Sequence, residues 1–81
     1  MIKKSINLTA EGKKELEKEL KELIDSRPVI AEKIATARAF GDLSENEEYS
    51  SARNEQKLAE SRILEIQEIL NYLYSILHLT L

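Results

Sequence analysis

The sequence predicts an all-α fold, a long antiparallel two-helix coiled-coil hairpin, on three observations. Charged residues make up 33% of the 81 residues, while aromatic residues make up only 5% and the chain has two glycines and one proline. This composition favours long helices over packed sheets. Apolar residues recur at alternating spacings of three and four in both halves of the chain, which is the pattern of helices that pack along a seam. The link between the halves is so short that it joins antiparallel neighbours.

The first predicted helix begins after Thr9 and extends to about Phe40. Thr9 is suited to cap a free backbone N–H, and Glu11 suits the positive end of the helix dipole. The seam has one polar member, Arg27. Its apolar or small members are Leu16, Leu20, Leu23, Ile30, Ile34 and Ala37.

Pro28 lies inside this first helix, where a proline removes a hydrogen bond and clashes with the preceding turn at a cost of about 3 kcal/mol. Ser26 is able to cap a new helix, which would give a three-helix chain. The seam, however, keeps its phase from Leu23 through Arg27 to Ile30. We therefore expect one helix with a kink.

The predicted link is Gly41-Asp42-Leu43, with Gly41 in the left-handed position that follows a helix end. Ser44 is the predicted N-cap of the second helix, and Ser44 with Glu47 matches a capping box. The seam of the second helix comprises Tyr49, Ala52, Gln56, Ala59, Ile63, Ile66, Leu70, Leu73 and Leu77.

Folding at the link sets the register between the two seams. It places Ile34 opposite Ala52 and Leu16 opposite Leu70. Small seam residues then fall toward the tip and large ones toward the base. We therefore expect a slender rod that is narrowest at its tip.

The domain organisation predicted is a hairpin over residues 1–75, with its tip near 41–45, followed by residues 76–81. That last segment is either the truncated start of a missing C-terminal domain or an apolar tail. Residues 77–81 alternate with a period of two, which would suit a strand.

The base of the hairpin offers a function of another class. The sequence loses its charges after Glu68. An exposed apolar base typically marks an interface, so a structural coiled-coil module that forms a homo-oligomer, a four-helix bundle, is an alternative. The residues of this apolar base are Tyr72, Tyr74, Ile76 and Leu77.

Several classes of protein are excluded by composition. The chain has no cysteine, so it has neither a disulfide framework nor a thiolate metal site. No apolar stretch approaches the roughly 20 residues that span a bilayer, and no signal-peptide pattern opens the chain. We expect a cytoplasmic protein with no membrane partner.

The net charge of −3 argues against a protein that binds nucleic acid through bulk positive charge. Any contact with nucleic acid should therefore be local.

The stretch FGDLSENEEY gathers carboxylates without any lysine or arginine to neutralise them. Glu47 is assigned to capping, which leaves Asp42, Glu45 and Glu48. Clustered carboxylates repel one another unless a cation is present, and Mg²⁺ prefers a few carboxylates together with phosphate oxygens. We expect an incomplete Mg²⁺ site that a partner completes. A solvated acidic turn is the alternative, because acids near a helix N-terminus are favourable by themselves.

Arg38 and Arg53 flank the acidic stretch, one on each predicted helix and about one helical turn below the tip. This placement suits them to bracket a bound phosphate chain. Ordinary ion pairing on the surface is the alternative for both.

The stretch ARAFGDLSENEEYSSARNEQ resembles the tip of the N-terminal coiled coil of the bacterial Gre transcript-cleavage factors (GreA/GreB). The resemblance extends from Leu8 to about Leu70. It implies that the hairpin enters the secondary channel of RNA polymerase. There the tip carboxylates would help to bind a second Mg²⁺ at the polymerase's own active site.

The same resemblance assigns roles to residues. Asp42 and Glu45 would hold the ion and its attacking water, and Glu48 and Tyr49 would support the tip. The two arginines, Arg38 and Arg53, would contact the backtracked nascent RNA. The chain would then not be an enzyme but would stimulate the nuclease activity of RNA polymerase. The family also carries a C-terminal domain that docks at the channel entrance, so a hairpin-only competitor of full-length factors is a further alternative.

Overall fold

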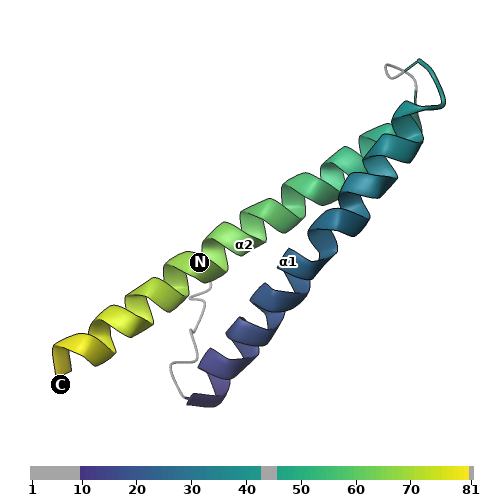
Figure 1. The fold of residues 1–81 in the computed structure, drawn as a ribbon. Coiled ribbons are helices and arrows are strands. Elements are labelled where there is room, and N and C mark those ends of the chain that lie inside the picture. Colours follow the sequence, from purple (N-terminus) through teal and green to yellow (C-terminus); the bar gives the residue numbers. More distant parts are fainter. Residues whose placement is uncertain (1–9, 43–45, 81) are drawn as a thin grey trace.

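The structure is a computed structural model that describes residues 10–42 and 46–80, with side chains as far as residue 76. It contains two helices, α1 (Ala10–Arg38) and α2 (Glu47–Thr80). They lie side by side and antiparallel, and the connection at one end forms the tip (Figure 1). The all-α hairpin predicted from the sequence is confirmed. Neither helix, over the part described, has a stretch long and apolar enough to cross a membrane.

The core consists of two clusters along the single interface between the helices. The tip cluster contains Ile30, Ile34 and Ala52, with Tyr49 and Ala59 packed against it. The base cluster contains Ile66, Leu70 and Leu73, and its partly buried neighbours are Leu16, Leu20, Leu23 and Ile69. Ile63, which lies between the two along α2, is buried as well. Small residues thus contribute to the core near the tip, and large ones fill it toward the base, as the seams predict.

The register predicted from the seams is confirmed in both clusters. Ile34 and Ala52 belong to the tip cluster, and Leu16 packs against the cluster that contains Leu70. The molecule is slender, with a longest dimension of 56 Å. That length agrees with about 51 Å for the 34 residues of α2 at 1.5 Å per residue.

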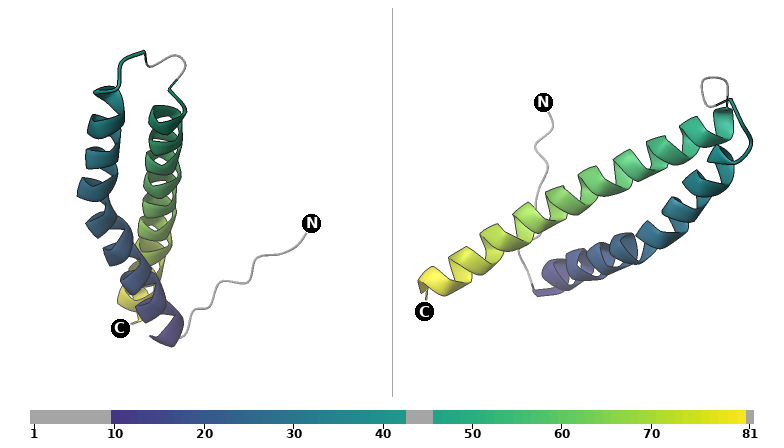
Figure 2. Two further views of the ribbon diagram at one scale, coloured as in Figure 1. Left: turned by 90° about the vertical axis from the view of Figure 1, so that its right-hand side faces the viewer. Right: turned by 45° about the horizontal axis from the view of Figure 1, so that its top comes forward.

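Helix α1 passes through Pro28 without interruption. Leu23 and Ile30, on either side of the proline, both belong to the core, so the expectation of one helix is confirmed and the three-helix alternative is wrong. The Ser26 hydroxyl donates a hydrogen bond to the Leu23 carbonyl oxygen at 2.6 Å instead of capping a new helix. Such back-bonding often accompanies a bend, and α1 is visibly bowed (Figure 2).

The connection between the helices is longer than predicted. Helix α1 ends at Arg38 and α2 begins at Glu47, so residues 39–46 form the connection.

At the other end of α2, the helix continues to Thr80. The alternating pattern at 77–81 therefore does not form a strand as far as residue 80, because helical hydrogen bonding continues through it.

Ion pairs join the two helices along the edges of the interface. Arg27, the polar member of the first seam, is exposed, and its Nε and Nη2 each donate to a carboxylate oxygen of Glu60 at 2.8 Å. Lys33 pairs with Glu55 at 3.2 Å. These contacts cross from one helix to the other, and each is consistent with the register that the core defines.

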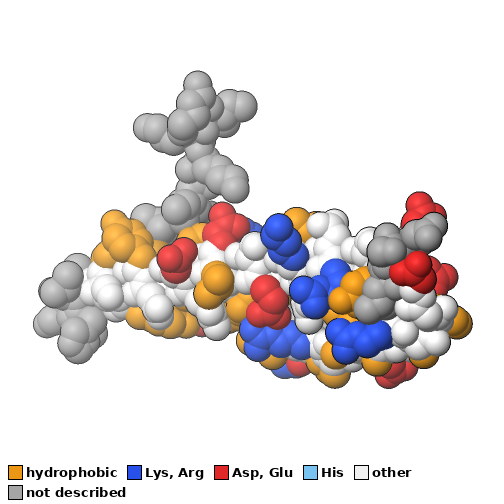
Figure 3. Space-filling model, turned by 90° about the horizontal axis from the view of Figure 1, so that it is seen from above, with side chains coloured by type: hydrophobic (Ala, Val, Ile, Leu, Met, Phe, Trp, Pro, Cys, Tyr) orange, Lys and Arg blue, Asp and Glu red, His pale blue; other side chains and the backbone are white. Residues whose placement is uncertain are grey.

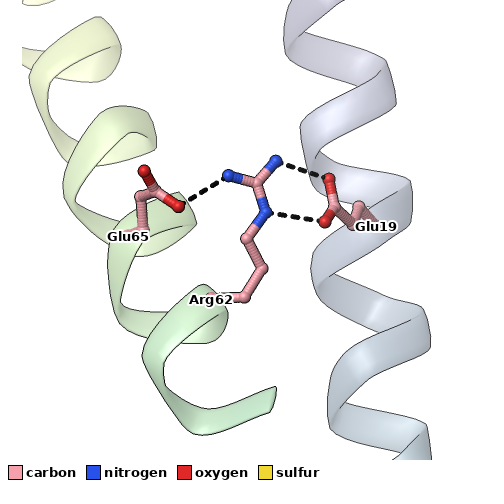
Figure 4. Close-up of polar contacts among 3 residues, drawn as sticks. All are labelled: Glu19, Arg62 and Glu65. Carbon is pink, nitrogen blue, oxygen red and sulfur yellow. Dashed lines mark hydrogen bonds and ion pairs between the residues drawn. The ribbon is translucent and has the colours of Figure 1, made fainter. Parts of the chain in front are cut away.

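Arg62 makes the most extensive of these contacts (Figure 4). Its Nε and Nη2 donate to the two carboxylate oxygens of Glu19 on α1, at 2.7 and 2.8 Å, and Nη1 donates to Glu65 at 2.7 Å. The hydrogen bonds from Arg62 lower the pKa of Glu19 below its usual value. The ionised form of Glu19 is therefore the one that makes this contact between the helices.

At the base of the hairpin, one of the predicted apolar residues makes polar contacts with α1. The Tyr74 hydroxyl donates to Glu17 at 2.7 Å, and the Lys13 ammonium lies 5.0 Å from the centroid of the Tyr74 ring. Tyr74 is therefore not a free member of the apolar base to which the sequence assigned it. Tyr72 is 60% exposed and Ile76 is half-buried. Leu77 has no described side chain.

Lowering the pH should weaken the hairpin partly through Glu19. The folded-state pKa of Glu19 is below the usual 4.5. Its contribution to the free energy of unfolding is therefore fully present above the unfolded-state pKa and is lost as the pH falls through the folded-state pKa. Glu19→Gln should lower the melting temperature at pH 7. The corresponding loss in the free energy of unfolding should be about 0.2–1 kcal/mol, the range that exposed ion pairs contribute. The difference from the unmutated chain should disappear in acid. Circular dichroism melts between pH 7 and pH 3 measure this.

Glu22→Gln, at an exposed glutamate on the same helix, is the control for the Glu19 experiment. It removes the same charge without touching Arg62. A difference between the Glu19→Gln variant and the unmutated chain that is constant across the pH range would contradict the assignment.

Replacing Pro28 with alanine should stabilise the hairpin, because Pro28 is exposed and denies α1 one hydrogen bond. The free energy of unfolding in urea should rise by up to about 3 kcal/mol. Val29→Ala, at the exposed neighbouring position, should leave stability nearly unchanged. A loss of stability in the Pro28→Ala variant would mean that the bow of α1 is itself needed for core packing.

Candidate functional site

The tip begins where α1 unwinds. The Ala39 amide donates to the carbonyl oxygens of both Ala35 and Thr36 at 3.2 Å, and the Phe40 amide donates to that of Ala37 at 3.1 Å. The bonding thus tightens from the α-helical to the shorter pattern that commonly ends a helix. Gly41 follows with a φ of 112°, a conformation that favours glycine. The sequence prediction of a left-handed residue at this position is confirmed.

The N-cap of α2 is Asn46, and the predicted capping box of Ser44 and Glu47 is wrong. The Asn46 carbonyl oxygen accepts the first helical hydrogen bond from Ser50 at 3.0 Å, and its side-chain Oδ1 accepts from the Tyr49 amide at 3.0 Å. Glu47 is therefore the first helical residue and not the third. Ser44 itself lies outside the described residues.

Asn46 also reaches across to the first helix, a contact that the sequence did not predict. Its Nδ2 donates to the Ala37 carbonyl oxygen at 2.7 Å. One side-chain amide thus satisfies an N-terminal donor of α2 and adds a second donor to the Ala37 carbonyl oxygen of α1, which also accepts from the Phe40 amide. Asparagine ranks with serine as an N-cap, and Asn46 stands directly before the acidic first turn of α2, so the cap was detectable from sequence. The bond to α1 was not.

The predicted acidic residues lie around this tip. Asp42 is exposed and follows Gly41 directly. Glu48 is exposed in the first turn of α2 together with Glu47, where the helix dipole favours negative charge. Glu45 lies outside the described residues. Within 10–42 and 46–80, no group of three or more histidine, aspartate or glutamate residues could hold a metal ion.

Tyr49 and Arg38, both predicted site residues, contact each other. The Arg38 guanidinium carbon lies 5.9 Å from the centroid of the Tyr49 ring, within the range of a cation–π interaction. Tyr49 is half-buried and packs against the tip cluster. Tyr49 thus packs on the core near the tip, and its supporting role stays a prediction. Its contact with Arg38 belongs to neither of the roles foreseen for that arginine.

Arg53, the other predicted arginine, is exposed on α2. With Tyr49, Asn54 and Lys57 it lines a shallow depression along one side of the hairpin. Figure 3 shows Lys and Arg side chains over the half of the hairpin nearer the tip, with Asp and Glu side chains among them and at the tip itself. Glu60 also lines the depression, but Arg53 and Lys57 give it a net positive charge. We call this side of the hairpin the positively charged flank, and it adjoins the acidic tip.

A second groove near the tip differs in charge. It has a volume of about 770 Å³. Among the described residues that line it, one is basic, Lys33, and it is paired with Glu55. The acidic residues that line it are Glu32, Glu47, Glu48 and Glu55. Acidic side chains thus predominate in this groove, whereas the depression beside Arg53 has two basic residues, Arg53 and Lys57, and one acidic residue, Glu60.

Comparison with known proteins identifies relatives of the chain. Transcription elongation factor GreA 2 of Lactiplantibacillus plantarum is 53% identical over 70 residues, which cover 85% of this chain and 44% of that protein. Transcription elongation factor GreA of Thermoanaerobacter pseudethanolicus is 51% identical over 70 residues, with 85% and 45% covered. The GreA of Streptococcus suis is 47% identical over 73 residues, with 89% and 46% covered. No solved structure matches the chain.

These matches extend over most of the hairpin but over less than half the length of each relative. Residues 6–74 also match the family described as "Transcription elongation factor, N-terminal". That range includes both helices up to the base and every predicted site residue. The chain therefore belongs to the GreA/GreB family of transcription elongation factors, of which it matches the N-terminal region.

Proposed function

We propose that the chain acts on RNA polymerase as the hairpin of a transcript-cleavage factor. Its tip enters the secondary channel and stimulates the polymerase to cleave backtracked RNA. The observation that carries this proposal is the exposed carboxylate of Asp42 at the end of a slender two-helix rod. A carboxylate presented in this way is able to reach a site inside another protein.

The shape of the chain supports a role inside a partner's channel. The rod is 56 Å long, and a single interface between two helices forms its core. Two helices that pack along one seam offer little room for an enclosed active site. We therefore assign the chain no turnover by itself and treat it as a stimulator of the polymerase's nuclease activity.

The acidic residues fit a shared Mg²⁺ better than an autonomous one. Asp42, together with Glu45, supplies the hard oxygen donors that Mg²⁺ prefers, but two carboxylates leave most of its octahedral shell to other ligands. The polymerase and the RNA phosphates would supply those ligands. When bound, the ion would lower the pKa of an attacking water and neutralise charge on the scissile phosphate.

The remaining tip residues would hold and orient the RNA and the acids. Glu48, exposed in the first turn of α2, adds negative charge beside the ion without serving as a ligand. Tyr49 anchors that turn to the tip cluster. Arg53, on the positively charged flank, would contact the phosphates of the backtracked RNA, and Arg38 would do so while lying over the Tyr49 ring.

A competitor of full-length factors is the second function consistent with this chain. The chain covers less than half of its relatives, and the part that it does not match would contribute docking energy. A hairpin that enters the channel but is held weakly would displace other factors only at high concentration. The same experiment separates the two functions.

Neutralising the tip carboxylates should abolish stimulation without unfolding the chain. With arrested, backtracked RNA polymerase and Mg²⁺, the chain at high concentration should accelerate release of the RNA 3′ segment. Asp42→Asn or Glu45→Gln should lower that rate by at least about tenfold, since even outer-shell groups of metal sites commonly have effects of 10–100-fold. Gel analysis of the labelled RNA measures the rate, and circular dichroism checks the fold.

Glu47→Gln is the matched control, because it removes a charge from the first turn of α2 at a position to which the family resemblance assigns no role in the site. It should leave stimulation largely intact. Full stimulation by a chain lacking both the Asp42 and Glu45 charges would refute the metal-holding role. Inhibition of a full-length factor by a chain that stimulates nothing would establish the competitor instead.

A further inference from the structure

We propose that Asn46 is the positioning residue of the tip. Its side-chain amide ties the last turn of α1 to the first turn of α2 and so fixes where Asp42 and Glu48 stand. The consequence for transcript cleavage rests on the proposed function. The tie itself is a property of this chain and is tested separately below.

The geometry of Asn46 uses both ends of one planar amide. Nδ2 donates to the Ala37 carbonyl oxygen at 2.7 Å, and Oδ1 accepts from the Tyr49 amide at 3.0 Å. Among short side chains, only asparagine carries a donor and an acceptor on a rigid fork of this kind. Capping alone would need only the acceptor, which serine, threonine and aspartate also supply. The donor bond therefore points to a role beyond capping.

Both groups that Asn46 binds are anchored in the core. Ala37 is 2% exposed, so its carbonyl has little access to water and depends on protein donors. Tyr49 packs on the tip cluster, and the Arg38 guanidinium covers its ring. A side chain held between two such points cannot move without disturbing one of them.

The carboxylates stand on the two sides of this tie. Asp42 follows the last turn of α1, and Glu48 belongs to the first turn of α2. If Asn46 releases Ala37, the described contacts that still join the helix ends are the contact between Arg38 and Tyr49 and the seam below it, in addition to the connection 39–46. The acids would then sample many separations. A metal site shared with a partner needs its ligand Asp42, and the negative charge of Glu48 beside it, to be preorganised, because small displacements of such groups are costly.

Variants at Asn46 separate capping from positioning. Asn46→Asp and Asn46→Ser both keep an acceptor for the Tyr49 amide, but aspartate has no donor and serine is too short to reach Ala37 in the same way. Asn46→Ala loses both bonds. If Asn46 is only a cap, the aspartate and serine variants should behave like the unmutated chain. If Asn46 is a positioning residue, both should resemble the alanine variant at the tip while keeping helicity.

The first readout needs no polymerase. The chain has no cysteine, so Ala39→Cys and Ser50→Cys, at exposed positions on the two sides of the tip, give a unique pair of spin labels. Pulsed electron resonance should show a narrow distance distribution with Asn46. It should broaden in the aspartate and serine variants. Narrow distributions in both variants would overturn the proposal, whatever the chain does to RNA polymerase.

The second readout is the rate of cleavage by backtracked polymerase over a range of chain concentrations. In both variants the maximal rate should fall about tenfold or more, while the concentration giving half the maximal effect stays unchanged. A rise in that concentration at an unchanged maximal rate would overturn the positioning role. If the unmutated chain stimulates nothing, the proposed function fails, and the label distances still decide whether Asn46 ties the helices together.

Discussion

The hairpin depends on one constraint, which is that each helix packs against the other along a single interface. In the part of the chain that the structure describes there is no third layer, so the buried hydrophobic side chains lie on one seam. Ile63 and Ile66 are the most deeply buried of these residues, at 1% and 0% exposure, and burying a side chain of this kind typically contributes about 1.5–3 kcal/mol. The ion pairs of Arg27 and Arg62 lie at the margins of this seam and reinforce its register.

This constraint gives the tip its character. Toward the tip the core depends increasingly on small residues such as Ala37 and Ala52, which keep the rod slender but contribute little burial. Specific contacts take the place of apolar packing there. Asn46 joins the two helix ends, and Arg38 covers the ring of Tyr49. The end that presents acidic side chains is thus ordered by a few directional contacts and not by a large core.

The sequence predicted what depends on periodicity and missed what depends on contacts across the tip. The heptad spacing located the buried residues and the register, because a seam determines both. The sequence predicted the N-cap at Ser44 because a local pattern of serine and glutamate matches a capping box. In the structure the N-cap is Asn46, which also donates a hydrogen bond to the Ala37 carbonyl oxygen. The strand-like alternation at the end of the chain gave way to helix for a similar reason, because a long helix already underway propagates by one hydrogen bond per residue.

We propose that the tip supplies ligands for a Mg²⁺ that RNA polymerase holds weakly by itself. The Mg²⁺ dependence of transcript cleavage by backtracked polymerase, with and without a saturating amount of the chain, tests this directly. The chain should lower the Mg²⁺ concentration needed for half the maximal rate, because added carboxylates tighten the site. A faster maximal rate with an unchanged Mg²⁺ dependence would contradict it and would mean that the tip acts by its shape.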